Sequence, residues 1–242
     1  MGLHSNLMSP RTTNFLYSLL SATSQLVVAF LLGLSALPAF LFIHWLSSVL
    51  LSDQTAIWQA LLFCLSLGLA FVLFGNTLLL LIVIVRTLFR IRSQEQRGRL
   101  FSAAALGSVL YNLLLSLAAF FYLPLLRSSI LIIWFYRGMG ARIGTGTVIA
   151  TTRLWDCDLI EIGENCMIGG NASIAAHVIN GSRGRLRRVR IGNSVTIGAN
   201  SSIMPGVVIE DDVIVGANSL VPQGMHLEKG GVYLGVPVRK VN

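Results

Sequence analysis

The sequence predicts a chain of two unlike halves: an α-helical transmembrane domain over residues 1–139, and a three-sided prism of short parallel β-strands over residues 140–242. Three observations predict this fold. The first half contains two apolar runs long enough to cross a bilayer. In the second half, aliphatic residues return every six positions. Charge is also divided unevenly, because residues 1–140 carry eight arginines and two acidic residues, whereas residues 141–242 carry ten basic and eight acidic residues.

Composition supports a membrane protein and narrows the classes of partner. The chain is 54% hydrophobic and only 12% charged, a balance that soluble domains of this length rarely show. Its net charge of +8 comes mostly from the apolar half, where basic residues orient spans and contact anionic lipid headgroups. We therefore exclude nucleic acid as a partner and expect membrane lipids instead. The three cysteines lack the spacing of a disulfide framework or of a thiolate metal site.

The apolar runs at residues 26–50 and 57–85 predict a transmembrane hairpin, with Trp45 and Trp58 flanking the connecting loop at the bilayer interface. Ahead of this hairpin, polar residues recur at helical spacing over residues 12–25. That segment is either an amphipathic helix on the membrane surface or the polar face of a longer spanning helix. The sequence leaves both alternatives open.

The distribution of arginine predicts how the hairpin is oriented in the cell inner membrane. Five arginines follow the second span between residues 86 and 99, whereas the loop at Asp53 carries no positive charge. The positive-inside rule places the arginine segment and the N-terminus in the cytoplasm. Residues 100–136 are again apolar, but Pro124 and Arg127 interrupt them. Because Arg127 would be costly at mid-bilayer, we expect in-plane or re-entrant helices there, which keep the second half on the cytoplasmic side.

A six-residue period defines the second half. The aliphatic residues are Ile143, Ile149, Ile162, Ile168, Ile174, Ile191, Ile197, Ile203, Ile209, Val215, Val221 and Leu227. Small or β-branched residues follow four positions later, at Ala172, Val178, Val195, Ser201, Val207, Val213 and Ser219. Neither an α-helix nor an alternating strand has this period. A prism explains it: aliphatic residues fill the axis, the small residues pack beside them, and Gly or Asn takes left-handed backbone angles at each corner.

These hexads resemble the left-handed parallel β-helix of the hexapeptide-repeat acyltransferases, over roughly residues 140–242. More narrowly, "MGARIGTGTVI" and "WDCDLIEIGENCMIGG", together with the apolar N-terminal half, resemble the membrane-anchored C-terminal domain of polylysine-synthetase-like peptide synthetases. The resemblance implies a homotrimer that takes its acyl group from acetyl-CoA or another acyl-CoA. We expect no metal.

The repeat pauses at one place, directly after a histidine. In the hexad that starts at Ile174, Val178 is expected to point inward, so His177 is expected on the outer surface. The next repeat residue is Ile191, which leaves residues 179–190 as an excursion loop beginning beside the imidazole. In the resembled family, a histidine near such a loop is the general base at a subunit interface, a role that suits an imidazole pKa near neutrality. The alternative is a solvated histidine without a role.

A carboxylate is expected to orient the second ring nitrogen of His177, and Glu161 and Asp158 of the preceding coil are the candidates. The irregular spacing between Ile149 and Ile162 prevents their placement. His226 is expected to be structural or exposed to solvent.

Two further groups of residues are candidates for binding. The excursion carries arginines that either form a solvated basic loop or bind phosphate, from CoA or from a lipid-linked acceptor: Arg183, Arg185, Arg187 and Arg188. The C-terminal "GGVYLGVPVRKV" resembles the terminal element of CoA-dependent hexapeptide transferases. This resemblance implies CoA contacts at Gly198, Ala199, Gly216, Ala217, Gly235, Val236, Pro237, Arg239 and Lys240. The alternative is that Pro237 ends the coil and the basic pair caps the chain.

The function predicted from these features is a membrane-anchored acyltransferase. It would move an acyl group, most simply acetyl, from acyl-CoA to a hydroxyl or amine of a lipid-linked or membrane-partitioned acceptor, with His177 as general base. A non-catalytic trimeric scaffold on a membrane anchor is the alternative. A metal-dependent β-helix hydratase would need three histidine ligands, whereas the repeat half has only His177 and His226.

Overall fold

The computed structural model of the chain describes residues 10–50, 55–99, 103–180 and 183–241. Contacts divide the chain into two compact units, Met1–Leu78 and Leu79–Asn242. The second unit therefore includes the apolar segment after residue 103, which the sequence analysis assigned to the membrane domain. The candidate site lies entirely within this second unit.

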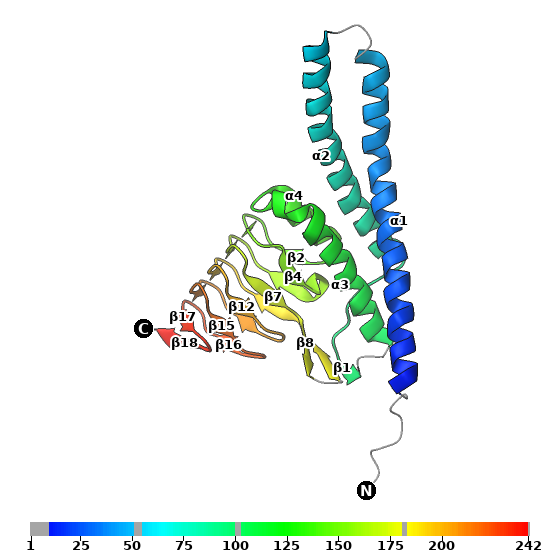
Figure 1. Cartoon of the computed structure of the whole chain (residues 1–242). Helices are drawn as coiled ribbons and strands as arrows, with labels where there is room; N and C mark the ends of the chain where they lie inside the picture. Colours follow the sequence, from blue (N-terminus) through cyan, green and yellow to red (C-terminus); the bar gives the residue numbers. More distant parts are fainter. Residues whose placement is uncertain (1–9, 51–54, 100–102, 181–182, 242) are drawn as a thin grey trace. The chain divides into compact units, whose positions relative to one another are not determined.

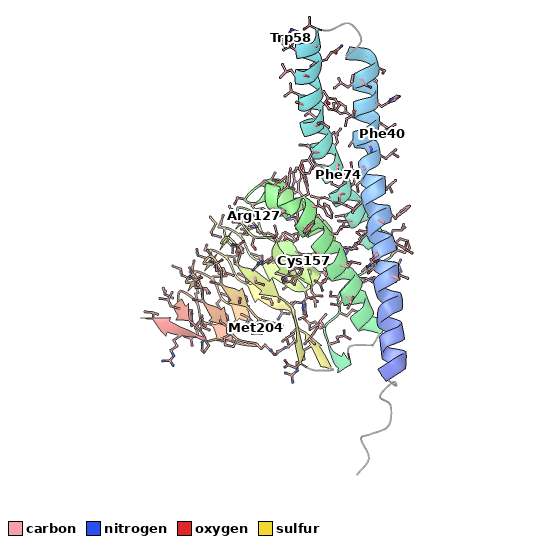
Figure 2. All side chains as sticks on the ribbon, viewed as in Figure 1. Phe40, Trp58, Phe74, Arg127, Cys157 and Met204 are labelled. Carbon is pink, nitrogen blue, oxygen red and sulfur yellow. The ribbon has the colours of Figure 1, made fainter. Side chains whose placement is uncertain are left out.

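The first unit contains the helix α1 (Pro10–Leu50) and most of the helix α2 (Ala56–Leu88), coloured blue and cyan in Figure 1. Two stretches, Ala22–Val49 and Ala56–Leu88, are long and apolar enough to cross a membrane. Large apolar side chains on α1 are exposed, including Phe40, labelled in Figure 2, at 65%. α1 runs unbroken through residues 12–25, so the backbone there continues the long helix. The loop residues 51–54 lie outside the described residues.

The second unit contains the predicted parallel β-helix, whose three faces are three parallel sheets (Figure 1). The first face consists of β2 (Arg142–Ile143), β5 (Ile160–Ile162), β10 (Val189–Ile191), β13 (Val208–Ile209) and β16 (His226–Leu227). The second consists of β3 (Val148–Ile149), β6 (Met167–Ile168), β11 (Thr196–Ile197), β14 (Ile214–Val215) and β17 (Val232–Gly235), extended by the antiparallel β18 (Val238–Val241). The third consists of β4 (Arg153–Trp155), β7 (Ser173–Ala175), β12 (Ser202–Ile203) and β15 (Leu220–Val221).

The core of the prism is the set of aliphatic residues that the period identified. All twelve are buried, from Ile143 at 7% exposure to several at 0%. Of the seven small residues predicted to point inward, six are buried, and Val178 is the exception. At the corners, asparagine takes the left-handed conformation in "IGAN" and "VGAN", since φ is 58° at Asn200 and 55° at Asn218. These buried ladders of Ile and Val provide the main hydrophobic contribution to the stability of the prism.

The predicted excursion loop is a β-hairpin rather than a loop. β8 (His177–Asn180) and β9 (Arg183–Leu186) pair antiparallel, and β1 (Gln96–Arg99) adds a third strand from the arginine segment after α2 (Figure 1). The chain leaves the prism after the buried Ala176, and Val178 pairs with Arg185 instead of pointing inward. The hexad register therefore ends before His177, because hairpin pairing replaces coil stacking there.

Three short elements cover the first coil of the prism. They are the helix α3 (Ala103–Phe121), the 3-10 turn η1 (Leu123–Leu126) and the helix α4 (Ile130–Gly138). α3 contacts β4, and α4 contacts β2 and β3, with Tyr111 and Tyr136 fully buried beneath them. The apolar stretch of α3, Gly107–Phe121, is shorter than a membrane span. That these helices lie in the membrane plane stays a prediction.

Candidate active site

Two breaks in the repeat fall at one edge of the prism, where the chain passes from the third face to the first. In the first coil the break is the 3-10 turn η2 (Cys157–Leu159), preceded by Asp156 in the left-handed conformation with φ 49°. Figure 2 labels Cys157 at this corner. In the second coil the break is the hairpin that begins at His177. Because Trp155 pairs with Ala175 across the two coils, Asp156 and His177 lie side by side.

Asp156 is fully buried, and hydrogen-bond donors surround its carboxylate. Oδ1 accepts hydrogen bonds from Ser93 Oγ at 2.5 Å, Ser108 Oγ at 2.5 Å and Asn112 Nδ2 at 2.8 Å. Oδ2 forms an ion-pair hydrogen bond with Nδ1 of His177. A buried carboxylate is costly unless its oxygens are hydrogen-bonded, and here both oxygens have partners. This arrangement favours the ionised carboxylate.

The two side chains alter each other's affinity for protons. Burial alone would raise the pKa of Asp156, but the hydrogen bonds from His177, Ser108 and Ser93 outweigh it and hold that pKa below its ordinary value. The hydrogen bond to Asp156 raises the pKa of His177 above its ordinary value, against the opposing effect of burial. His177 is therefore a stronger base than a solvated histidine.

The geometry leaves one ring nitrogen of His177 available for chemistry. Nδ1 donates its proton to Asp156, so the neutral imidazole carries its lone pair on Nε2. The side chain is 31% exposed, and within the described part of the chain no hydrogen bond reaches Nε2. An imidazole held by a carboxylate at one nitrogen and open at the other can remove a proton from a hydroxyl or an amine.

The support for Asp156 comes from α3 and from the segment after α2. Asn112 forms two hydrogen bonds with Asp156. Its Nδ2 donates to the carboxylate, and its Oδ1 accepts from the backbone N–H of Asp156 at 3.1 Å. On the residue directly before Asn112, the hydroxyl of Tyr111 donates to Met139 O at 2.6 Å and accepts from Asp158 N–H at 3.1 Å. Helix α3 thus holds both Asp156 and the 3-10 turn that follows it.

The predicted carboxylate partners of His177 are wrong. Glu161 points along the first face, where it pairs with Arg142 at 3.0 Å and Arg188 at 2.8 Å. Asp158 accepts from Ser93 N–H at 2.7 Å, and burial raises its pKa to about 6. The physical reason is the left-handed turn at Asp156, which aims that side chain, and not its neighbours, at the imidazole.

The arginines of the excursion lie apart from one another. Arg188 is half-buried and paired with Glu161 and with Glu95, the latter at 3.3 Å. The guanidinium of Arg187 covers the corner glycines of the next two coils, because a Cβ added at Gly206 or Gly224 would lie 2.9 Å or 3.1 Å from it. Arg185 is exposed, and the side chain of Arg183 lies outside the described residues. Phosphate binding by these four stays a prediction.

The predicted CoA residues lie together on a different edge of the prism, between the second and third faces. Ala199 and Ala217 are exposed there, and the hairpin turn Gly235–Pro237 ends beside them, since Leu234 packs on Gly216. Packing between coils explains Gly198 and Gly216, because a Cβ on either would collide with the next coil. Arg239 is exposed, whereas Lys240 pairs with Glu228 at 2.6 Å.

Sequence reasoning missed Asp156 and the three side chains that hold it. A signal existed for Asp156, which precedes His177 by about one coil and sits where the period slips. Ser108 and Asn112 are one helical turn apart in an apolar segment, a spacing that indicates a buried polar stripe. No local signal connected Ser93 to the prism.

Comparison with known proteins supports the interpretation of the second half of the chain as a hexapeptide-repeat domain. The family described as "Bacterial transferase hexapeptide (six repeats)" matches residues 188–223, and the "Hexapeptide repeat of succinyl-transferase" matches residues 160–181. YvoF of Bacillus subtilis, named as a provisional acetyltransferase, is 38% identical over 110 residues, 44% of this chain and 63% of that protein. Delta-poly-L-ornithine synthetase of Acinetobacter baumannii is 29% identical over 104 residues, 43% of this chain and 8% of the synthetase.

The chain thus spans less than two thirds of either relative. Among solved structures, a hexapeptide-repeat acetyltransferase from Vibrio cholerae aligns with 18% identity and a TM-score of 0.40, covering 47% of this chain and 79% of that one.

Proposed function

The repeat domain belongs to the hexapeptide-repeat acyltransferase family, and from this premise we propose that the protein is a membrane-anchored acyltransferase that uses acyl-CoA, with His177 as general base. The acyl group, most simply acetyl, passes to a hydroxyl or amine of a membrane-associated acceptor. The observation that carries this proposal is the pairing of a half-exposed imidazole with a buried, fully hydrogen-bonded carboxylate at the broken edge of the prism.

The proposed reaction is a direct transfer. Nε2 of His177 takes the proton of the acceptor while the acceptor oxygen or nitrogen attacks the thioester carbonyl. The tetrahedral intermediate collapses with cleavage of the carbon–sulfur bond, and the imidazolium returns the proton to the leaving thiolate of CoA. Asp156 keeps Nδ1 protonated throughout and stabilises the imidazolium. No covalent enzyme intermediate is required.

The arrangement of the two edges supports an active site shared between copies. Within one subunit, His177 lies between the third and first faces, whereas the predicted CoA residues lie between the second and third. A homotrimer would bring the histidine edge of one copy to the CoA edge of the next. The outward residues of the second face are mostly apolar and suit this contact, with Met167 at 46% and Ile214 at 45% exposure on either side of Thr196. Ile214→Arg should therefore yield monomers in size-exclusion chromatography with light scattering.

Membrane anchoring rests on α1 and α2. Two adjacent apolar helices of spanning length would keep the prism at the membrane surface, where an acceptor with a lipid tail is concentrated. Delta-poly-L-ornithine synthetase contains a region similar to this chain over 8% of its own length.

The test uses the full chain purified in detergent, radiolabelled acetyl-CoA and a lipid extract of the host membrane as the source of acceptor. We expect saturable donor binding and transfer of label into the extract. His177→Ala should retain donor binding and lose transfer. Donor binding without any transfer in the wild type, or no binding at all, would favour the non-catalytic scaffold.

A further inference from the structure

A pocket of about 550 Å³ adjoins the support of the catalytic pair, on the other side of Ser93. It lies at the C-terminal end of α2, and its walls include Arg86, Arg92, Arg188 and Gly140. Ser93 belongs to both places, because its hydroxyl donates to Asp156 and its backbone N–H donates to Asp158, a wall of the pocket. All of these residues lie within the second unit.

The pocket is lined by more arginine side chains than carboxylates. The carboxylates in its walls are Glu95 and Asp158. Glu95 is neutralised by Arg188, which reaches it through Nε at 3.3 Å and through its backbone N–H at 3.1 Å. Arg86 and Arg92 form no ion pair with any residue that the structure describes. Two positive side chains therefore face the space without a counter-charge within salt-bridge distance.

Two residues that line this pocket each have a buried side-chain atom without a hydrogen-bond partner among the described residues: Nε of Arg86 and Oδ1 of Asp158. Unsatisfied buried polar atoms are rare in folded proteins, and each costs free energy unless a ligand or ordered water supplies the bond. An anionic oxygen of a ligand would accept the hydrogen bond that Nε of Arg86 lacks, whereas Oδ1 of Asp158 is itself an acceptor and needs a donor such as a hydroxyl or a water.

Gly140 makes room for the arginine. Its φ is 100°, and a Cβ at this position would lie 2.5 Å from Nη2 of Arg86 and 3.1 Å from Cβ of Asp158. Any larger residue would displace the guanidinium from the pocket. A second pocket of about 270 Å³, also lined by Arg86 and Arg92, adds Arg90 beside it. The arginine surface thus continues beyond the first pocket.

We propose that this pocket binds a phosphate group, supplied by the headgroup of a membrane lipid or by a soluble phosphate ester. The planar guanidinium groups of arginine match the paired oxygens of phosphate. The volume exceeds that of a phosphate ion, so the site accommodates a headgroup attached to it. Its place at the end of α2 is where arginines meet headgroups in a membrane protein. This inference is independent of acyl transfer, and its test contains no acyl donor.

The test titrates dihexanoyl-phosphatidylglycerol into the full-length protein in neutral detergent by calorimetry. Dihexanoylglycerol, which has the same chains and no phosphate, is the lipid control. We expect saturable binding of the phospholipid only. Arg86→Gln and Arg92→Gln should each weaken it about tenfold or more, because each removes a charge-assisted contact to phosphate. Arg92 is exposed, so its variant keeps the test valid if Arg86→Gln fails to fold.

Two further variants sharpen the result. Arg153→Gln removes an exposed arginine on the third face, outside this pocket, and should bind as tightly as the wild type. Asp158→Asn should bind equally or more tightly, because it removes a repelling carboxylate. Binding that survives both Arg86→Gln and Arg92→Gln, or that matches the phosphate-free lipid, would overturn the proposal.

Competition identifies the source of the phosphate. Displacement of the phospholipid by inorganic phosphate at similar concentration supports the site with a soluble phosphate ester as its ligand. Resistance to a hundredfold excess supports the site with a lipid headgroup as its ligand.

Discussion

The edge between the third and first faces is built differently in the two ends of the prism. In the later coils, residues 204–207 and 222–225 turn this corner in four residues, each time through a glycine with positive φ, Gly206 or Gly224. In the earlier coils the same corner holds a left-handed aspartate followed by a 3-10 turn, and then a hairpin. A backbone hydrogen bond from Gly224 N–H to Pro205 O at 3.0 Å joins the later corners, whereas the earlier ones carry the only His–Asp pair among the described residues.

The regular coils thus contribute to the stability of the fold, whereas the broken corners carry the candidate catalytic residues. A regular coil buries its aliphatic residue and satisfies its backbone by pairing with the coils on either side, which leaves no polar group for another use. The broken corners bury a carboxylate that needs outside donors, and α3 supplies two of them. Helix α3, which covers the first coil, therefore supports the candidate site as well as the fold.

The largest expected effect is at the histidine of the broken edge. His177→Ala should lower the transfer rate about 10²–10⁴-fold, the usual contribution of a general base, with acetyl-CoA affinity unchanged. The matched control is His226→Ala, on a regular coil, where the side chain is exposed and pairs with Glu210 at 2.8 Å. It should leave the rate unchanged. Equal rates for the two variants would remove the distinction between the edges.

Substitutions in the core of the regular coils should lower the stability of the protein and leave its catalytic rate nearly unchanged. Ile203→Ala deletes a side chain that is 1% exposed, and should lower the free energy of unfolding by about 2–5 kcal/mol. The kcat of the folded fraction should stay within about twofold of the wild type. Thermal unfolding in detergent measures the change in stability, and single-turnover transfer measures the catalytic rate. Ser202→Ala, on the same strand, is the control for the substitution itself.

A smaller effect on the rate is expected at Asn112, which contacts Asp156 and not the reacting atoms. Asn112→Ala removes both contacts of that side chain with Asp156, and should lower kcat about tenfold with little change in KM. Val109→Ala on the same helix removes an exposed side chain and serves as the control. A wild-type rate for Asn112→Ala would show that α3 covers the prism without positioning the aspartate.

The comparison also explains what could be predicted from sequence. The six-residue period follows from burial in a narrow axis, so the residues from Ile191 to Leu227 define their own coils. The first coil was harder to read because Leu154 occupies the axis one residue early, aligned with Ile174. Because of this one-residue shift, the six-residue period did not predict the position of Asp156.

The support of the site could not be derived from local pattern. Ser93 pairs with Asp156 across 63 residues, and β1 joins the hairpin from the arginine segment, contacts that depend on the whole fold. His177 was identified because it adjoins the pause in the repeat. Its carboxylate partner required the backbone conformation at Asp156, which no periodicity encodes.

The central claim is that Asp156 raises the basicity of His177 for use as a general base. The most direct measurement is the pH dependence of kcat for the wild type and for Asp156→Asn, with the same acceptor in both. Transfer needs the neutral imidazole, so the rate rises with pH through the pKa of His177. Because the carboxylate raises that pKa, Asp156→Asn should move the rising limb to lower pH and lower the plateau. An unchanged limb and an unchanged plateau would contradict the account.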